Sequence, residues 1–280
     1  MTRYRILAIT TKYWMPKTDY VQEITESVKE KIDDGDFVVV SEKAISTALN
    51  NIIDESSVEP TLSSEFIAKF WMRTVWGYIL GPLCHLPVTF LKRLREYPFE
   101  EGSRHKQVAL QHCGLLQALM FGSEGGIDAS NLAYSYVSLP LGNARGIAQR
   151  IRKELLQESH KKVCVIIPDT DKTYSFRNFH FSPRSSSFNG IHSFAGVFAY
   201  VAGRFFKLSR RATPLAIAGC EVQVEDALEI ADAANRARGS GAGRTVWDMA
   251  DRFKVDLADV SWEMLQTVKH KPIVILRSRR

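Results

Sequence analysis

The sequence predicts an α/β (α+β) fold in which mixed sheets pack against helices. Residues 5–51 alternate strand-like and helix-like patterns, which is how an α/β domain typically begins. An apolar run at 163–167 ends abruptly in Pro168-Asp169-Thr170, as a buried strand does when it delivers polar side chains to its carboxyl end. A second apolar run, residues 272–276, closes the chain as another strand. These runs together predict a buried sheet covered by helices.

The first 51 residues carry clear signals for each element. Asp19 is a suitable N-cap, and Val21, Ile24 and Val28 recur after it at helical spacing. A cluster of Asp and Gly residues then forms a turn before the next apolar run. The predicted elements are a strand at 5–10, a loop at 11–18, a helix at 20–33, a turn at 33–36, a strand at 37–40 and a helix from 41 toward 51.

The next part of the chain contains an apolar segment that must be tested as a membrane span. Residues 75–91 are slightly shorter than the ~20 residues that cross a bilayer, and Gly81, Pro82 and Pro87 interrupt them. We therefore expect a buried or dimer-facing helix and loop. The elements predicted around it are a polar loop at 52–63, a helix at 64–80, an exposed charged loop at 93–105 and an apolar helix or strand at 108–120.

The second half of the chain alternates again. Residues 171–195 are rich in Ser, Asn, Phe, Arg and His and predict a long irregular loop, of a kind that is often functional. The other predictions are helices at 144–158, 225–238, 246–253 and 256–268, an apolar segment at 196–208, a Gly-rich loop at 239–243, and strands at 163–167, 214–219, 221–224 and 272–276. We expect a single domain over residues 1–280, with two interleaved subdomains of about 1–200 and 201–280 as the alternative.

The composition limits the classes of function. Hydrophobic residues make up 45% and charged residues 24% of the 280, which argues against intrinsic disorder. The net charge of +6 suits an anionic partner such as a nucleotide or a phosphodiester coenzyme, although many soluble proteins are mildly basic. Four cysteines without a CxxC pair form no zinc or dithiol motif, and Cys164 is expected to be a small core residue in a reducing cytosol. The amino terminus lacks the pattern of a secretory signal, so a cytoplasmic location is expected.

Two aspartates form the sharpest candidate site. Asp128 lies in the segment GGIDASN at 125–131, where paired glycines let the backbone approach a ligand closely. Asp169 follows the apolar run and precedes Thr170. Two carboxylates brought together can hold a magnesium ion together with substrate phosphates. The alternative is that each aspartate only caps a turn.

Two further segments have features of phosphate sites. The Gly-rich loop lacks the GK[ST] ending of a P-loop, but its backbone amides could hold phosphate with Arg244 alongside. The alternative is a helix C-cap at Gly239. Ser41, Glu42 and Lys43 lie where a predicted strand ends and a helix begins, a frequent ligand position in α/β folds.

The polar stretch at 177–192 supports no strong enzyme motif. A Ser-His hydrolase is not indicated because the chain has no GxSxG segment. His180 and His192 fit no strong zinc spacing, so both are expected to be solvated or structural. The phenylalanines that interleave with the basic residues could stack on a planar ring, but a core-facing cluster is favoured.

These segments resemble the coenzyme F-420 gamma-glutamyl ligase family. The resemblance is carried by GGIDASN, then SLPL, a helix containing Ile151-Arg152, and VIIPDT, and it is clearest over residues 122–170. It implies a gamma-glutamyl-ligase-like fold and an intertwined homodimer. It also implies the family's reaction, in which L-glutamate is joined to the deazaflavin precursor F-420-0 with GTP and a divalent metal.

The resemblance also implies roles for individual residues. The implied metal ligands are Asp128, Asp169 and Thr170, for Mg²⁺ or Mn²⁺, with K⁺ as a further candidate. The implied contacts to GTP or ATP are Ser41, Glu42, Lys43, Asn131, Gly239, Ser240, Gly241 and Gly243. Lys172 and Arg177 are expected to bind the anionic acceptor, and no residue stands out as a general base.

The chain departs from the family pattern in three places. Thr47 stands where the family usually has lysine, so Lys43 is expected to supply that charge. Residues 171–177 lack the Gly-Arg that usually follows the Asp-Thr pair, and Ser240 replaces a longer polar residue. Two alternatives therefore stay open. One is a related ligase with another acceptor or amine donor; the other is a non-catalytic nucleotide- or nucleic-acid-binding protein. Neither nucleic acid nor a membrane is the expected partner.

Overall fold

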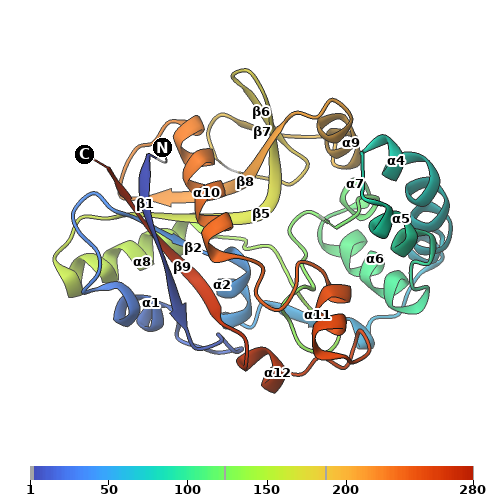
Figure 1. Ribbon diagram of the computed structural model, residues 1–280, viewed down its shortest axis with the longest axis horizontal. Helices are drawn as coiled ribbons and strands as arrows, with labels where there is room; N and C mark the ends of the chain where they lie inside the picture. Colours follow the sequence, from blue (N-terminus) through green and yellow to red (C-terminus); the bar gives the residue numbers. More distant parts are fainter. Residues whose placement is uncertain (1–2, 123, 187, 280) are drawn as a thin grey trace.

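A mixed sheet and a group of helices form the two halves of the molecule (Figure 1). The computed structural model describes residues 3–122, 124–186 and 188–279. Over these residues, seven strands form one sheet in the order β1-β9-β2-β5-β6-β7, with β8 paired to β5, while β3 and β4 form a small second sheet. The strands are β1 (Tyr4–Thr11), β2 (Phe37–Val40), β3 (Ile52–Asp54), β4 (Tyr136–Ser138), β5 (Cys164–Phe176), β6 (Phe179–Ser182), β7 (Ile191–Ser193), β8 (Ser209–Ala218) and β9 (His270–Ser278).

Both parallel and antiparallel pairs occur, which confirms the predicted mixed sheet. β2 runs parallel to β5, and β6 runs parallel to β7. β9 lies antiparallel between β1 and β2, and β8 lies antiparallel beside β5. Residues after 200 therefore share one sheet with residues before it.

The apolar strands bury both of their faces, and alternate residues face opposite cores. Val38 and Val40 face a core with α1 and α8, whereas Val39 between them faces a core with α10. Ile273 and its neighbours in β9 alternate in the same way. Because side chains alternate across a strand, a continuous apolar run suits a sheet covered on both faces.

Helices cover the sheet and build the other half. In Figure 1, α1 and α8 lie on one side of the sheet and α10 crosses the other. The helices are α1 (Tyr20–Val28), α2 (Glu42–Ala48), η1 (Glu55–Ser57), α3 (Leu62–Phe66), η2 (Ile67–Leu80), α4 (Gly81–Leu83), α5 (Val88–Arg95), α6 (Glu100–His112), α7 (Leu115–Ala118), α8 (Ala144–Ser159), α9 (Val197–Phe205), α10 (Val224–Arg238), α11 (Val246–Phe253) and α12 (Trp262–Gln266).

The helical layer, residues 62–121 with α9, has its own core. Met72, Trp76 and Leu94 are fully buried in it. Its longest segment, η2, is a π-helix, a wide helix that is rare in proteins. Among the described residues, none of the helices is both long and apolar enough to cross a bilayer, in agreement with the prediction for 75–91.

Several predicted elements differ from the structure. The exposed loop predicted at 93–105 is wrong, because α5 ends within it and α6 begins at Glu100. The irregular loop predicted at 171–195 is wrong in part, because β5 continues to Phe176 and β6 and β7 follow. A strand predicted at 221–224 is absent from the described structure, where α10 begins at Val224. The helix predicted at 256–268 shrinks to α12, and the loop at 52–63 contains β3 and η1.

Cys164 is buried in the core, as predicted, but the structure does not have it as a reduced thiol. Cys164 at the start of β5 forms a disulfide with Cys220, which follows β8. Antiparallel pairing of β5 with β8 brings the two ends together, with 5.5 Å between the Cα atoms. Cys84 and Cys113 are free thiols.

Candidate functional site

A cavity of about 750 Å³ opens between the sheet half and the helical layer. Ligand sites commonly have this size. Its lining includes ten of the predicted site residues, namely Ser41, Lys43, Asp128, Asn131, Thr170, Lys172, Gly239, Ser240, Gly241 and Gly243. Segments more than 200 residues apart in the sequence therefore meet at one place. Glu42, Asp169 and Arg177 do not line the cavity.

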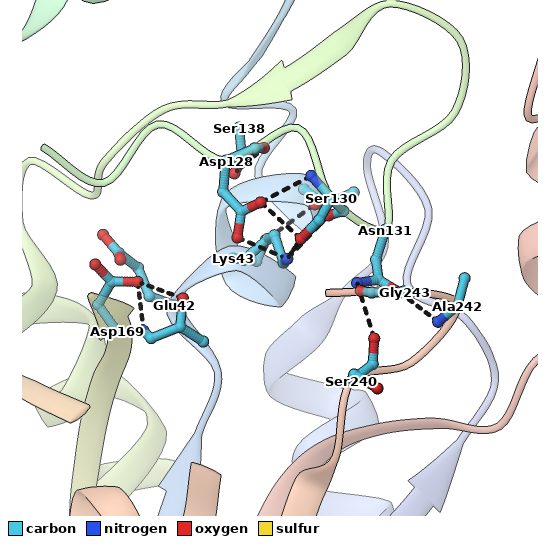
Figure 2. A network of polar contacts seen from close by, with 12 residues as sticks. Glu42, Lys43, Asp128, Ser130, Asn131, Ser138, Asp169, Ser240, Ala242 and Gly243 are labelled. Carbon is cyan, nitrogen blue, oxygen red and sulfur yellow. Dashed lines mark hydrogen bonds and ion pairs between the residues drawn. The ribbon is translucent and has the colours of Figure 1, made fainter. Parts of the chain in front are cut away.

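Lys43 is held against the GGIDASN loop. It lies in the first turn of α2, directly after β2, and its Nζ contacts Asp128 Oδ2 at 2.8 Å. The same ammonium donates to Ser130 Oγ at 2.8 Å and to the Ser130 carbonyl at 2.9 Å. Figure 2 shows these three side chains in one group. Because the ammonium donates three hydrogen bonds here, it is a fixed positive charge in the cavity wall.

Asn131 anchors the Gly-rich loop. Its Nδ2 donates to the carbonyls of Gly243 at 2.9 Å and Ser240 at 3.2 Å, and its Oδ1 accepts from the amide of Ala242 at 2.5 Å (Figure 2). Gly241 has φ +61°, and a Cβ there would lie 2.3 Å from Asn131 Oδ1. Both polar atoms of the Asn131 side chain are therefore used to shape the loop.

Glu42, Arg184 and Asp169 form a buried ionic triad. Arg184 Nη1 donates to Glu42 Oε2 at 2.5 Å and also to Asp169 Oδ2, while Nη2 donates to Glu42 Oε1 at 2.5 Å. Burial raises the pKa of Glu42. Burial also acts to raise the pKa of Asp169, but the charge of Arg184, its hydrogen bond and the hydrogen bonds from backbone amides together outweigh burial, and the pKa is lowered. For Arg184, burial is outweighed by the two carboxylates, so its pKa is raised and it stays charged.

A β-bulge that follows Asp169 places Thr170 in the cavity wall, while Asp169 itself stays outside the lining. The strand predicted to end at Asp169 continues, but its register with β8 shifts between Asp169 and Lys172. The residues within the shift, Thr170 and Asp171, line the cavity, as does Lys172. Bulges often redirect side chains beside active sites. The polar end predicted for this strand is thus a bend within a longer strand.

The predicted metal ligands are not grouped as a metal site. Asp128 is paired with Lys43, and Asp169 is paired with Arg184 (Figure 2 shows the two aspartates in separate groups). Over residues 3–122, 124–186 and 188–279, no group of three or more His, Cys, Asp and Glu side chains is placed to hold a metal. Both carboxylates already balance a side-chain cation. The residues therefore do not fit a preformed site for Mg²⁺ or Mn²⁺.

Sequence reasoning missed Arg238, a basic residue of the cavity wall. Arg238 ends α10, just before the Gly-rich loop, and its Nη2 donates to Asn235 Oδ1 at 2.9 Å. Burial lowers its pKa, and the charges of Asp169 and Asp128 oppose that change. The sequence did contain a signal for Arg238, because a basic residue in the last turn of a helix that precedes a Gly-rich loop lies close to that loop. With Lys43, it gives this end of the cavity two recessed cations that suit phosphate.

His270 lines the same wall in its neutral form. Burial, followed by the nearby charges of Arg238 and Lys43, lowers its pKa to about 3. The ring lies 4.7 Å from that of Tyr13. An anion bound beside these cations would find an uncharged, partly aromatic surface next to them.

The helical layer contributes a second charged end to the cavity. His105 contacts Glu55 Oε1 at 2.7 Å through Nδ1 and lies 3.7 Å from Glu124 Oε2. Burial would lower the pKa of His105, but the two glutamates raise it to about 10. Lys106 Nζ contacts Glu124 Oε1 at 2.7 Å, so Glu124 lies between the side chains of a lysine and a histidine.

Arg177 is not brought to the site. It lies in the turn between β5 and β6, with its guanidinium 5.6 Å from the centre of the Phe176 ring. Its role in acceptor binding was predicted from a loop that is a β-hairpin in the structure. His180 is buried and contacts Ser175 Oγ at 2.9 Å, consistent with the expected structural role.

Comparison with known proteins agrees with this arrangement. The family model described as F420-0:gamma-glutamyl ligase matches residues 8–277. An uncharacterized protein of Methanocaldococcus jannaschii is 32% identical over 285 residues, which cover 98% of this chain and 96% of that protein. The matched region contains the helical layer, every residue of the cavity lining and all of the two sheets except the outer ends of β1 and β9. The chain therefore belongs to the F420-0:gamma-glutamyl ligase family.

Proposed function

We propose that this protein is a nucleotide-dependent ligase that joins the amine of L-glutamate to an anionic carboxylate acceptor of the F420-0 type. The observation that carries the proposal is the cavity, where the GGIDASN loop, the Asp-Thr bulge and the Gly-rich loop meet beside Lys43 and Arg238. Family membership supports the ligase class. The identity of the acceptor, and the choice between GTP and ATP, are parts of the proposal.

The basic end of the cavity suits the nucleotide phosphates. Lys43 and Arg238 are recessed cations, and the exposed Arg244 lines the same end. The Gly-rich loop adds backbone amides, and the space beside the Cα of Gly239 is open, since a Cβ there would meet nothing within 4 Å. Fixed donors of this kind stabilise charge that develops on a transferred phosphoryl group. Ser41 and Thr170, which also line the cavity, are proposed to add hydroxyl donors.

The reaction we propose has two steps. A carboxylate oxygen of the acceptor first attacks the terminal phosphorus, and the nucleoside diphosphate leaves. The neutral amine nitrogen of glutamate then attacks the acyl carbon and the amide bond forms. Inorganic phosphate leaves with the carboxylate oxygen and takes up the proton that the nitrogen loses. The cavity would contribute mainly positioning and electrostatic stabilisation. We propose that Lys172, whose Nζ lies 3.6 Å from Asp232 Oδ1, contacts the acceptor. Arg177 is not assigned this role, because it lies outside the cavity lining.

The metal assignment stays a prediction. Mg²⁺ or Mn²⁺ at Asp128, Asp169 and Thr170, and K⁺ as a further ion, were inferred from the resemblance, and no step above depends on them. The same holds for a cytoplasmic location.

The test is product formation with each nucleotide. The chain is incubated with GTP or ATP, L-glutamate and F-420-0 in buffer with divalent metal, and diphosphate release and product mass are measured. We expect a glutamyl adduct from the wild type and at least a tenfold loss of kcat/KM in Lys43→Met and in Arg238→Met. The matched control is Arg145→Met, an exposed arginine of α8 outside the cavity lining, which should retain activity.

Either alternative function would be recognised from the same assay. Diphosphate release with glutamate and a different carboxylate, but never with F-420-0, would indicate a related ligase. Saturable nucleotide binding without turnover under any condition would contradict the ligase proposal and indicate a binding protein.

A further inference from the structure

Two buried carboxylates converge on a single nitrogen atom. Glu42 comes from the first turn of α2 and Asp169 from the middle of β5, yet one oxygen of each contacts Arg184 Nη1. The side chains of Arg184, Glu42 and Asp169 are 3%, 4% and 10% exposed. Convergent carboxylates in a buried setting need a cation, because two unpaired negative charges would be strongly destabilising there.

The surrounding chain is shaped to admit a guanidinium. Gly126, in the GGIDASN loop, lies against Arg184, and a Cβ at this glycine would be 2.4 Å from Arg184 Cζ. Gly126 also has φ +101°, which side chains other than glycine's rarely allow. The arginine backbone is fixed as well, because its amide donates to Ser182 Oγ at 3.2 Å. The family motif and the triad are therefore in direct contact.

The triad also links the segments that build the cavity. Glu42 Oε1 accepts a hydrogen bond from the Leu141 amide at 2.8 Å, so the loop before α8 is joined to α2. Asp169 Oδ1 accepts from the Thr170 amide at 2.6 Å, at the bulge. A cation between Glu42 and Asp169 thus sets the positions of Lys43 and Thr170, their immediate neighbours on the cavity wall.

We propose that the guanidinium of Arg184 occupies the place of a divalent cation between Glu42 and Asp169, so that this chain carries a built-in positive charge where a metal would otherwise bind. Arg184 is a positioning residue, since it does not line the cavity. A planar guanidinium satisfies two carboxylates with directed hydrogen bonds, as the two-pronged contact to Glu42 shows. Asp169 is consequently unavailable to a metal, and of the three predicted metal ligands only Asp128 and Thr170 line the cavity that a divalent ion would enter with nucleotide phosphates.

The test measures ion binding and does not rest on the ligase reaction. Mn²⁺ is titrated into the nucleotide-free wild type and into Arg184→Ala by calorimetry and by electron paramagnetic resonance of free Mn²⁺. Removing the guanidinium leaves Glu42 and Asp169 facing an open space. We expect one Mn²⁺ site per chain to appear in Arg184→Ala, with at least tenfold tighter binding than in the wild type. The double variant Arg184→Ala, Asp169→Asn should lose that gain.

Equal Mn²⁺ affinity in the wild type and Arg184→Ala would overturn the proposal, as would a gain that survives Asp169→Asn. Arg184→Ala could fail to fold, because it leaves two buried carboxylates unpaired. A second measurement decides the question in that case. The variant Asp128→Asn keeps Arg184 in place, and we expect this variant to bind no Mn²⁺ in the absence of nucleotide. Mn²⁺ binding that is retained in Asp128→Asn would overturn the proposal.

Discussion

At the scale of single residues, the site depends on glycines whose backbone other residues rarely adopt. Gly241 combines φ +61° with an Asn131 oxygen 2.3 Å from the position of a Cβ. The oxygen belongs to a side chain that is held by three hydrogen bonds, so it cannot simply move aside. The Gly-rich loop therefore requires glycine at position 241 for steric and backbone reasons, independently of any flexibility that glycine provides.

We predict that Gly241→Ala lowers the free energy of unfolding by about 1–3 kcal/mol, because the substitution adds backbone strain and displaces Asn131. Urea unfolding measures the change, and nucleotide affinity should fall with it. Gly142→Ala is the matched control, since a Cβ there meets nothing within 4 Å, and it should stay within about 0.5 kcal/mol of the wild type. Equal effects of the two substitutions would contradict this explanation.

A second prediction concerns His105, whose pKa of about 10 in the folded chain lies above the ordinary value of about 6.5. A raised histidine pKa stabilises the folded state fully below pH 6.5, and the stabilisation is lost as the pH rises through 10. His105→Gln should therefore reduce the difference in unfolding free energy between pH 6 and pH 10. Urea unfolding at several pH values measures this difference. His112→Gln, at an exposed position of the same helix, should keep the wild-type profile.

Residue signals in the sequence identified part of the site. Asp19 is the N-cap that the sequence predicted, and it accepts a hydrogen bond from the Gln22 amide. This cap could be predicted because capping is a local interaction. Lys43 and Asp128 were each predicted as site residues, and they line one cavity and contact each other, while the nucleotide role of Lys43 stays a prediction. Arg184 could not be found in this way, because its partner Glu42 lies 142 residues away in the sequence. Local patterns carry no information about which distant carboxylate a buried arginine will meet.

At the scale of elements, charge and glycine misled the prediction for 93–105. Pro98 and a high density of charge favour an exposed loop, yet α6 begins two residues after the proline and buries Gly102, Lys106 and Val108. Gly102 lies under the ring of Tyr97, where a Cβ would be 2.3 Å from the ring. Lys106 is buried because its ammonium reaches Glu124 and the Met120 carbonyl. Tertiary contacts thus outweighed local propensity.

The disulfide between Cys164 and Cys220 is the strongest constraint on β5 and β8. It closes a loop with a sequence separation of 56 residues, and crosslinks of this kind typically contribute about 2–4 kcal/mol by restricting the unfolded chain. Cys220→Ser should lower the unfolding free energy by this order, and reductant should then have no further effect. Cys113→Ser, at a free thiol, serves as the control. Stability that is unchanged by reductant in the wild type would show that the bond is not formed in solution.

At the scale of the whole molecule, the helical layer leaves an apolar surface uncovered. Leu62, Phe66 and Phe70 are 85%, 58% and 46% exposed, and the two phenylalanine rings stack at 5.2 Å. Large exposed apolar patches often mark protein interfaces. The resemblance implies a homodimer, and we propose that this surface forms its interface.

We predict that the wild type elutes as a dimer, with about twice the chain mass of 31.6 kDa in light scattering. The double substitution Phe66→Ser, Phe70→Ser should shift it toward the monomer, because it removes the stacked pair from the interface. Phe206→Ser, at an equally exposed position after α9, is the control. A wild type that is monomeric at all concentrations would contradict the proposal.

The sequence predicted that the sheet is mixed, but it did not predict the order of the strands. Apolar runs identified β2, the first half of β5 and β9, and the mixture of element types indicated mixed pairing. Their order could not be inferred, because each buried run is apolar on both faces and fits beside any other. The insertion of β9 between β1 and β2 is set by antiparallel registers with both, such as Val38 with Ile275.

That insertion has a consequence for synthesis of the protein. A ribosome makes β1 and β2 first, whereas their shared neighbour β9, residues 270–278, follows β2 by more than 200 residues. Until then, the nascent chain holds two strands with open hydrogen-bonding edges at the position that β9 will fill, and such edges are prone to unwanted pairing. The central sheet can close only after residues 270–278 have been synthesised. Chains that stall before residue 270 would present these edges to chaperones and proteases.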